Sequence, residues 1–138
     1  MADRIRKVKY VNTTVSSRAG QGAKVLAELK KEGVNLVAFT GFPAKSGKAQ
    51  LDFVTEDLAG VRRVAKKNGW RLSPAKKGFL VQGSDQIGAV SRHIQKLADK
   101  KISITAADAV CAGQNRYGMI LWVKPKDYAR AARTLNAK

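Results

Sequence analysis

The chain is poor in the side chains that build catalytic and metal sites. Its 138 residues include one cysteine and one histidine, and only 10 acidic residues stand beside 27 basic ones. A single cysteine excludes a disulfide within the chain, and one His with one Cys leaves little material for a zinc site or a nucleophile–base pair. We therefore expect a protein that is not an enzyme, with no catalytic residues, no metal and no cofactor.

Long apolar runs are also missing. No stretch of 18 apolar residues is present to cross a membrane, and the first residues, Met-Ala-Asp-Arg-Ile-Arg-Lys, contain no apolar segment typical of a secretory signal. A cytoplasmic protein with no membrane partner is the simplest expectation. Hydrophobic residues still make up 44% of the chain, which is enough for a packed core.

The shortage of acidic residues gives a net charge of +17. Such a charge is typical of proteins that contact nucleic acid, but it also describes an ordinary solvated basic surface. The basic residues are spread along the chain and form no long basic arm. We therefore keep nucleic-acid binding as the alternative function.

An internal repeat organises the sequence. Residues 19–36 and 87–104, which are 68 positions apart, both predict a glycine turn, a helix, the end of that helix and the start of a strand. Gly20 corresponds to Gly88, and the apolar positions of the two helices match at a spacing of 3, 4 and 3, which is one helical face. The matched pairs are Ala19 and Ile87, Gly22 and Val90, Leu26 and Ile94, and Leu29 and Leu97. The repeat predicts one supersecondary unit used twice.

The first copy reads as β-α-β-β-α-β, the ferredoxin-like pattern. Strands are expected over residues 7–15, 34–40, 49–53 and 70–72, and a hairpin loop over 41–48. Helices are expected from the first glycine turn to about residue 32, and from a cap at Thr55 to residue 68. The glycines of the 41–48 loop are too far apart for a phosphate-binding loop.

The second copy reads the same way but ends early. Strands are expected over 79–82, 102–110 and 116–123, with a helix over 87–100 and another after Pro125. No fourth strand follows, so this copy should present a free edge or borrow a strand. We expect two units, 1–76 and 77–138, and because units of this size are marginal alone, we expect them to pack together and with a second chain.

The turns before the two repeated helices are the best candidates for binding. Each places free backbone N–H groups at a helix N-terminus, where carboxylates and phosphates are attracted. An ordinary capped turn is the alternative reading. His93 is expected to be a packing or interface residue, and Cys111 to lie in the core at the end of a strand.

At these turns the chain resembles the ACT domain family, regulatory modules that bind amino acids. That family carries Asp-Arg-Pro-Gly after its first strand and Gly-Ile-Asn-Ile thirteen residues beyond the motif's glycine. The first copy has Ser17-Arg18-Ala19-Gly20 and then Gly33-Val34-Asn35-Leu36, and the second has Asp85-Gln86-Ile87-Gly88 and then Lys101-Ile102-Ser103-Ile104. Only the second copy keeps the motif's Asp, and both lack its Pro.

The resemblance implies an α+β fold of two ferredoxin-like ACT-type units in tandem, with antiparallel sheets and helices on one face. It implies an amino acid or similar small carboxylate ligand, a homodimer, and ligand-dependent assembly or contact with a separate metabolic enzyme. Backbone N–H groups at the glycine turns would hold the carboxylate, and Asp85 could meet an ammonium group. The implied ligand-binding residues are Ser17, Arg18, Ala19, Gly20, Gln21, Asn35, Asp85, Gln86, Ile87, Gly88 and Ser103.

Overall fold

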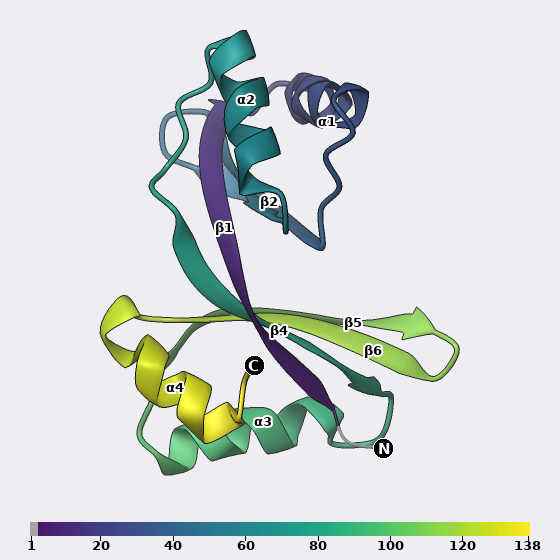
Figure 1. The fold of residues 1–138 in the computed structure, drawn as a ribbon, viewed down its shortest axis with the longest axis vertical. Helices are drawn as coiled ribbons and strands as arrows, with labels where there is room; N and C mark the ends of the chain where they lie inside the picture. Colours follow the sequence, from purple (N-terminus) through teal and green to yellow (C-terminus); the bar gives the residue numbers. More distant parts are fainter. Residues whose placement is uncertain (1–2) are drawn as a thin grey trace. The chain divides into compact units, whose positions relative to one another are not determined.

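The computed structural model describes residues 3–138 and has an α+β fold (Figure 1). Four of the strand pairs, β1–β3, β2–β3, β4–β6 and β5–β6, have an antiparallel register. None of the helices in this part of the chain is long and apolar enough to cross a membrane. In chain order the elements are β1 (Arg4–Ser16), α1 (Gln21–Lys31), β2 (Ala38–Ala44), β3 (Lys48–Val54), α2 (Leu58–Asn68), β4 (Lys76–Ser84), α3 (Ala89–Asp99), β5 (Ile104–Gly113), β6 (Arg116–Val123), the 3₁₀ turn η1 (Pro125–Asp127) and α4 (Tyr128–Leu135).

The chain forms two compact units, and β1 belongs to both. The first unit is Lys9–Lys76, and the second is Lys77–Lys138 together with the described residues up to Val8. Residues 3–8 therefore belong to the second unit, whereas the sequence analysis expected a first unit over 1–76. The reason is that β1 starts at Arg4, whereas the alternating apolar pattern predicted a strand that starts at residue 7.

In the first unit the strand order is β2-β3-β1. The segment after α2 runs along the other side of β1: Ser73 N–H donates to the Asn12 carbonyl at 2.8 Å, and the Thr13 hydroxyl donates to the Arg71 carbonyl at 2.9 Å. Residues 70–72 thus lie where a fourth strand belongs, but they do not form a regular strand as predicted.

In the second unit the order is β1-β4-β6-β5. The start of β1 lies beside β4, Ile5 is buried in the core, and the Lys138 N–H donates to the Ile5 carbonyl at 3.0 Å. The fourth strand that the second copy was expected to lack is therefore supplied by the beginning of the chain. Of the two expected outcomes, the free edge is wrong, because the second copy borrows its missing strand from the beginning of the same chain.

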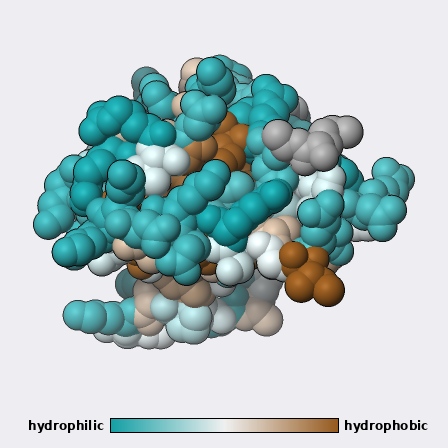
Figure 2. Space-filling view, turned by 90° about the horizontal axis from the view of Figure 1, so that it is seen from below, coloured by the Kyte–Doolittle hydropathy of each residue, from teal (hydrophilic) through white to brown (hydrophobic). Residues whose placement is uncertain are grey.

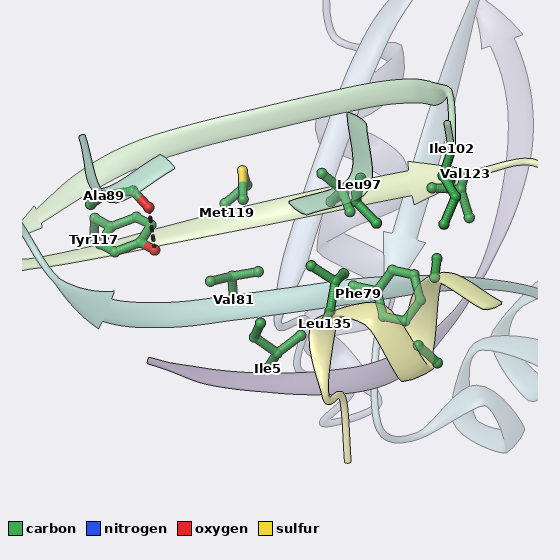
Figure 3. Close-up of a cluster of buried hydrophobic side chains, with 13 residues drawn as sticks. Ile5, Phe79, Val81, Ala89, Leu97, Ile102, Tyr117, Met119, Val123 and Leu135 are labelled. Carbon is green, nitrogen blue, oxygen red and sulfur yellow. Dashed lines mark hydrogen bonds between the residues drawn. The ribbon is translucent and has the colours of Figure 1, made fainter. Parts of the chain in front are cut away.

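Each unit has its own hydrophobic core. Leu29 of α1 and Leu97 of α3 occupy equivalent places and are 1% and 0% exposed. Figure 3 shows the second core, in which side chains from α3 and α4 meet those from β4 and β6. Phe79 there stacks on Tyr128, whose hydroxyl donates to the Gly78 carbonyl. The first core is formed by Val11, Val25, Leu29, Val34, Leu51, Phe53, Val61 and Val64.

Two local predictions in the first unit are wrong. β2 covers Ala38–Ala44, so most of the predicted loop is strand and the turn is confined to residues 45–47. Helix α2 is capped by Asp57, whose carboxylate accepts from Gly60 N–H at 2.9 Å. The Thr55 hydroxyl instead donates to the Asn35 carbonyl at 2.7 Å and accepts from Asp57 N–H, so it ties the turn to the preceding loop.

Candidate ligand-binding site

The two glycine turns have the same backbone. Gly20 and Gly88 immediately precede α1 and α3 with φ values of 88° and 80°, in the left-handed region that glycine adopts without strain. The first helical hydrogen bonds are equivalent as well, since Lys24 N–H donates to the Gly20 carbonyl at 3.1 Å and Arg92 N–H to the Gly88 carbonyl at 3.2 Å. We call these turns the first corner (residues 17–21) and the second corner (residues 85–89).

Each corner is joined to the neighbouring β-hairpin by one equivalent hydrogen bond. Ser17 N–H donates to the Gly47 carbonyl at 2.9 Å, and Asp85 N–H donates to the Asn115 carbonyl at 2.8 Å. The two donors are 68 positions apart, and so are the two acceptors. The repeat found in the sequence is therefore also a repeat of backbone geometry, in which the hairpin positions the corner.

A pocket of about 320 Å³ lies at the second corner. It brings together three predicted site residues, Asp85, Gln86 and Gly88, with residues of β5 that sequence reasoning did not select. The fourth predicted residue, Ile87, is not among the lining residues and is fully exposed. The lining also includes Ala89, Val90, Ser91, Ala109, Val110, Cys111 and Tyr117.

One wall of the pocket carries a carboxylate with a thiol beside it. The Cys111 thiol donates to Asp85 Oδ2 at 3.2 Å. This hydrogen bond, together with the charge of Asp85, raises the pKa of the Cys111 thiol. Cys111 is exposed, so its expected position in the core is wrong. With its pKa raised, the thiol acts as a hydrogen-bond donor rather than as a nucleophile.

The start of α3 also lines the pocket. Gly88 provides no side-chain cap, and Val90 and Ser91 line the pocket within the first turn. The first N–H groups of a helix have no acceptor inside the helix, and the helix dipole favours negative charge at this end. The lining of the pocket therefore includes both N–H donors and a carboxylate acceptor.

The first corner lacks this chemistry. Ser17, Arg18, Ala19 and Gly20 are exposed, and Gln21 is half-buried. Ser17 stands where the second corner has Asp85, and Pro43 of β2 stands where β5 has Cys111. The pair that forms one wall of the second pocket thus has no equivalent here.

Asn35 and Ser103 do not join the corners within one chain. They follow α1 and α3, whereas the glycines precede these helices. Each helix has 11 residues, which corresponds to roughly 16 Å at the standard rise. Asn35 lines a different pocket, of about 410 Å³, with residues from the end of α1 such as Leu26 and Leu29.

A buried polar cluster, absent from the sequence predictions, lies next to the second pocket. Asp3 Oδ2 is 2.6 Å from His93 Nε2 and accepts from the Tyr117 hydroxyl, and Asp3 Oδ1 is 2.7 Å from an Arg92 guanidinium nitrogen. A Cβ at Gly83 would collide with the Asp3 carboxylate, so glycine makes room for it. His93 is buried as expected, and it fixes the N-terminal strand to α3.

The cluster changes the ionisation of its members. Burial raises the pKa of Asp3, but hydrogen bonds from Tyr117, His93 and Arg92 outweigh this and lower it to about 2. Burial and the hydrogen bond to Asp3 raise the pKa of Tyr117 to about 12. Asp3 is therefore ionised and Tyr117 neutral across the ordinary pH range. Within residues 3–138, no group of three or more His, Cys, Asp or Glu side chains is placed to hold a metal ion.

Comparison with known proteins identifies the fold. No protein-family model and no curated protein matches the sequence. A crystal structure of a Bacteroides thetaiotaomicron protein matches 96% of this chain and 88% of its own, with a TM-score of 0.79 and 16% identity. The ligand-free regulatory subunit of aspartate kinase from Thermus thermophilus matches over 98% and 93%, with a TM-score of 0.66 and 12% identity. The chain has the fold of ACT-type regulatory domains.

The same ACT-type fold occurs inside a larger enzyme. Aspartokinase III of Escherichia coli, in a complex with aspartate and ADP, matches 98% of this chain over 32% of its own length, with a TM-score of 0.54 and 15% identity. The β5 residues of the pocket that the sequence did not point to, Ala109 to Cys111, lie 20 or more positions beyond the second corner. Extending the 68-residue repeat matches them to Gly41, Phe42 and Pro43, but a repeat does not report which strand lies beside a corner.

Proposed function

We propose that the chain is a non-catalytic regulatory protein that binds a small carboxylate, in the first instance an amino acid, at the second corner. The observation that carries this proposal is the pocket whose lining contains both the uncapped start of α3 and Asp85. A zwitterionic amino acid has an anionic and a cationic group a few atoms apart, and this pocket offers a matching partner for each.

In this proposal the ligand carboxylate lies against the first-turn N–H groups at Val90 and Ser91. The ligand ammonium lies against Asp85, and the thiol of Cys111 keeps that carboxylate in place. The pocket volume of about 320 Å³ is at the lower end of the range for small-molecule sites, which favours a small ligand. Ala109 and Val110 provide the apolar surface for a short side chain.

The similar structures support a regulatory role in general terms, since several are named as regulatory subunits or domains of aspartate kinase. We propose that ligand binding shifts an assembly equilibrium, or contact with a separate metabolic enzyme. Such a shift requires that the ligand binds one state more tightly than the other.

Isothermal titration calorimetry of the full chain against the twenty amino acids tests the proposal. We expect binding heat with at least one of them, and its loss in Ala109→Phe, whose ring would fill the pocket. Ala19→Phe, at an exposed position of the first corner, is the control and should keep the heat. No heat with any amino acid, or heat that survives Ala109→Phe, would contradict the proposed site.

No observation favours the nucleic-acid alternative. Figure 2, seen from the side of α3 and α4, shows a largely hydrophilic face. The exposed cations are spread over helices of both units, for example Arg62 and Lys66 on α2 and Lys96 on α3. Titration with an oligonucleotide at two salt concentrations checks the alternative, because binding through phosphates weakens steeply with added salt.

A further inference from the structure

The residues that line the pocket at the second corner come from two groups of elements. The corner and the first turn of α3 provide one group, which includes Ala89 and Ser91, and the strands β5 and β6 provide the other, which includes Cys111 and Tyr117. The shape of the pocket therefore depends on how the start of α3 is held against the sheet. Asp3 is not among the lining residues, but it contacts both groups of elements.

Asp3 joins α3 to β6. Its Oδ1 lies 2.7 Å from an Arg92 guanidinium nitrogen and its Oδ2 lies 2.6 Å from His93 Nε2, and both of these partners belong to α3. On the sheet side, the Tyr117 hydroxyl of β6 donates to the same Oδ2. The Asp3 side chain is 2% exposed, and hydrogen bonds to a charged group are strong where water is excluded. Asp3 therefore fixes the first half of α3 against the sheet.

Tyr117 carries this constraint to the pocket. Its ring lines the pocket, and its hydroxyl makes a second, longer contact of 3.4 Å with the carbonyl oxygen of Ala89, the first residue of α3 (Figure 3). The hydroxyl has one proton and Asp3 is its closer acceptor, so Asp3 determines where that oxygen lies beside the helix. Tyr117 also pairs with Cys111 across the β5–β6 ladder, where directly opposite side chains are neighbours.

The first unit lacks these contacts at the equivalent positions. In the second unit Gly83, Tyr117 and Cys111 form one row across β4, β6 and β5, and the missing Cβ of Gly83 leaves room for the Asp3 carboxylate. The equivalent row of the first unit, 68 positions earlier, consists of three apolar residues, Val15, Ala49 and Pro43. The same row of an equivalent sheet is thus built without a tyrosine. The polar contacts belong to the unit that has the proposed ligand pocket.

We propose that Tyr117 is a positioning residue of the pocket at the second corner and that, through Tyr117, the docking of Asp3 sets the affinity of this pocket for its ligand. The affinity rests on the proposed function, whereas the positioning of the corner does not. Linkage makes the effect reciprocal, because a docked Asp3 that strengthens ligand binding is itself strengthened by the bound ligand to the same degree. Residues 3–8 then form a regulatory element of the site.

The first test follows the thiol of Cys111 and needs no ligand. Cys111 is the one cysteine of the chain and is exposed, so iodoacetamide labels this thiol and mass spectrometry gives the rate. In Tyr117→Phe and Asp3→Ala the corner is less firmly held and the hydrogen bond to Asp85 weakens. Alkylation at about pH 8 should then be at least about threefold faster, because the thiolate is the reactive form. Gly83→Ala, whose Cβ would displace the Asp3 carboxylate, should have the same effect.

Leu97→Ala is the matched control for a general loss of stability. Leu97 is buried in the same core near the other end of α3 and is not among the residues that line the pocket. Because Cys111 is already exposed, destabilisation alone should leave its alkylation rate unchanged in a variant whose circular dichroism shows that it is folded. An unchanged rate in both Tyr117→Phe and Asp3→Ala, or an equal rise in the control, overturns the positioning role.

The second test measures affinity by calorimetry with the amino acid that gives heat with the wild-type chain. Asp3→Ala and Tyr117→Phe should each weaken its binding at least about fivefold. The double variant should bind no more weakly than Asp3→Ala alone, because both substitutions remove the same contact. Leu97→Ala should keep the wild-type affinity. Unchanged affinity in both single variants, or losses that add in the double variant, contradicts the regulatory role.

Hydrogen exchange of the wild-type chain keeps the test decisive if Asp3→Ala fails to fold. The same amino acid at saturation should slow the exchange of the amides of residues 4–8, which do not line the pocket, and Tyr117→Phe should abolish this effect. Exchange that does not respond to the ligand contradicts the coupling. If no amino acid gives heat with the wild-type chain, the proposed function fails, whereas faster alkylation in the variants still supports the positioning role.

Discussion

The first and second corners share the same backbone conformation but carry different side chains. Both turn at a left-handed glycine, and both are joined to a hairpin by one equivalent hydrogen bond. Asp85 and Cys111 line a pocket at the second corner and are hydrogen-bonded to each other, whereas the equivalent Ser17 and Pro43 provide neither a carboxylate nor a thiol. The comparison shows that the two corners share their backbone geometry and differ in these two side chains, and we attribute the proposed ligand binding to that difference.

The two units also differ in the buried polar cluster around Asp3. The cluster around Asp3 belongs to the second unit, and the positions in the first unit that correspond to His93 and Tyr117 are Val25 and Ala49. The cluster joins Asp3, just before the strand that completes the sheet of the second unit, to His93 of α3 and Tyr117 of β6. The first unit receives the equivalent segment directly after α2.

Removing the equivalent core leucines tests how alike the two helices are. Leu29→Ala and Leu97→Ala should each lower the free energy of unfolding by roughly 2–5 kcal/mol, because both side chains are fully buried. Urea denaturation measures the loss. A large effect in one variant and a small one in the other would break the equivalence of the two cores.

Asp3→Asn should destabilise the protein by roughly 1.5–3 kcal/mol, the usual range for hydrogen bonds to a charged group. The folded pKa of Asp3, about 2, lies below its ordinary 3.8, so its contribution is present above pH 3.8 and is lost as the pH falls toward 2. Thermal melts of both proteins across this range measure the difference, which should disappear at the acid end. A difference independent of pH would contradict the ionised cluster.

The raised pKa of Tyr117 also makes the stability of the folded protein depend on pH in the alkaline range. Its folded value of about 12 lies above the ordinary 10.0, so its contribution is present below pH 10 and is lost as the pH rises toward 12. Tyr117→Phe should remove this alkaline loss in the same melts. The first unit has Ala49 at this position and contributes nothing comparable.

Asp85→Asn separates the corners by function. The substitution removes the negative charge of Asp85, which we propose contacts the ligand ammonium. It should weaken binding of the amino acid that gives heat in calorimetry at least about tenfold, which is about 1.4 kcal/mol. Ser17→Ala, at the equivalent position of the first corner, should leave the affinity unchanged. Calorimetry measures both, and equal losses would place the ligand elsewhere.

The smallest effect concerns the ends of the repeated helices. After α1 the chain turns at Gly33 with φ 72°, and after α3 it turns at Lys101 with φ 58°. A left-handed lysine costs about 1–2 kcal/mol that glycine avoids, and part of this is offset by the greater freedom of glycine in the unfolded chain. Lys101→Gly should therefore stabilise the protein by about 0.5–1 kcal/mol in urea denaturation, whereas Gly33→Lys should destabilise it.

The regular features of this chain could be predicted because they are local. The helix faces around Leu29 and Leu97 follow from apolar spacing, and the corners follow from Gly20 and Gly88. The pairs that give the second corner its character join residues far apart in sequence, such as Asp85 with Cys111 and Asp3 with Tyr117. No periodic pattern reports such contacts, because they depend on which strands become neighbours.

The shared strand β1 has a consequence for the order in which the chain folds. During synthesis Lys9–Lys76 can complete its sheet as soon as it has left the ribosome, whereas residues 4–8 must wait for β4, which is made later. The Ile5 carbonyl also accepts from the Lys138 N–H, which is later still in the sequence. Because these contacts join residues far apart in sequence, their formation is expected to be a late, slow step.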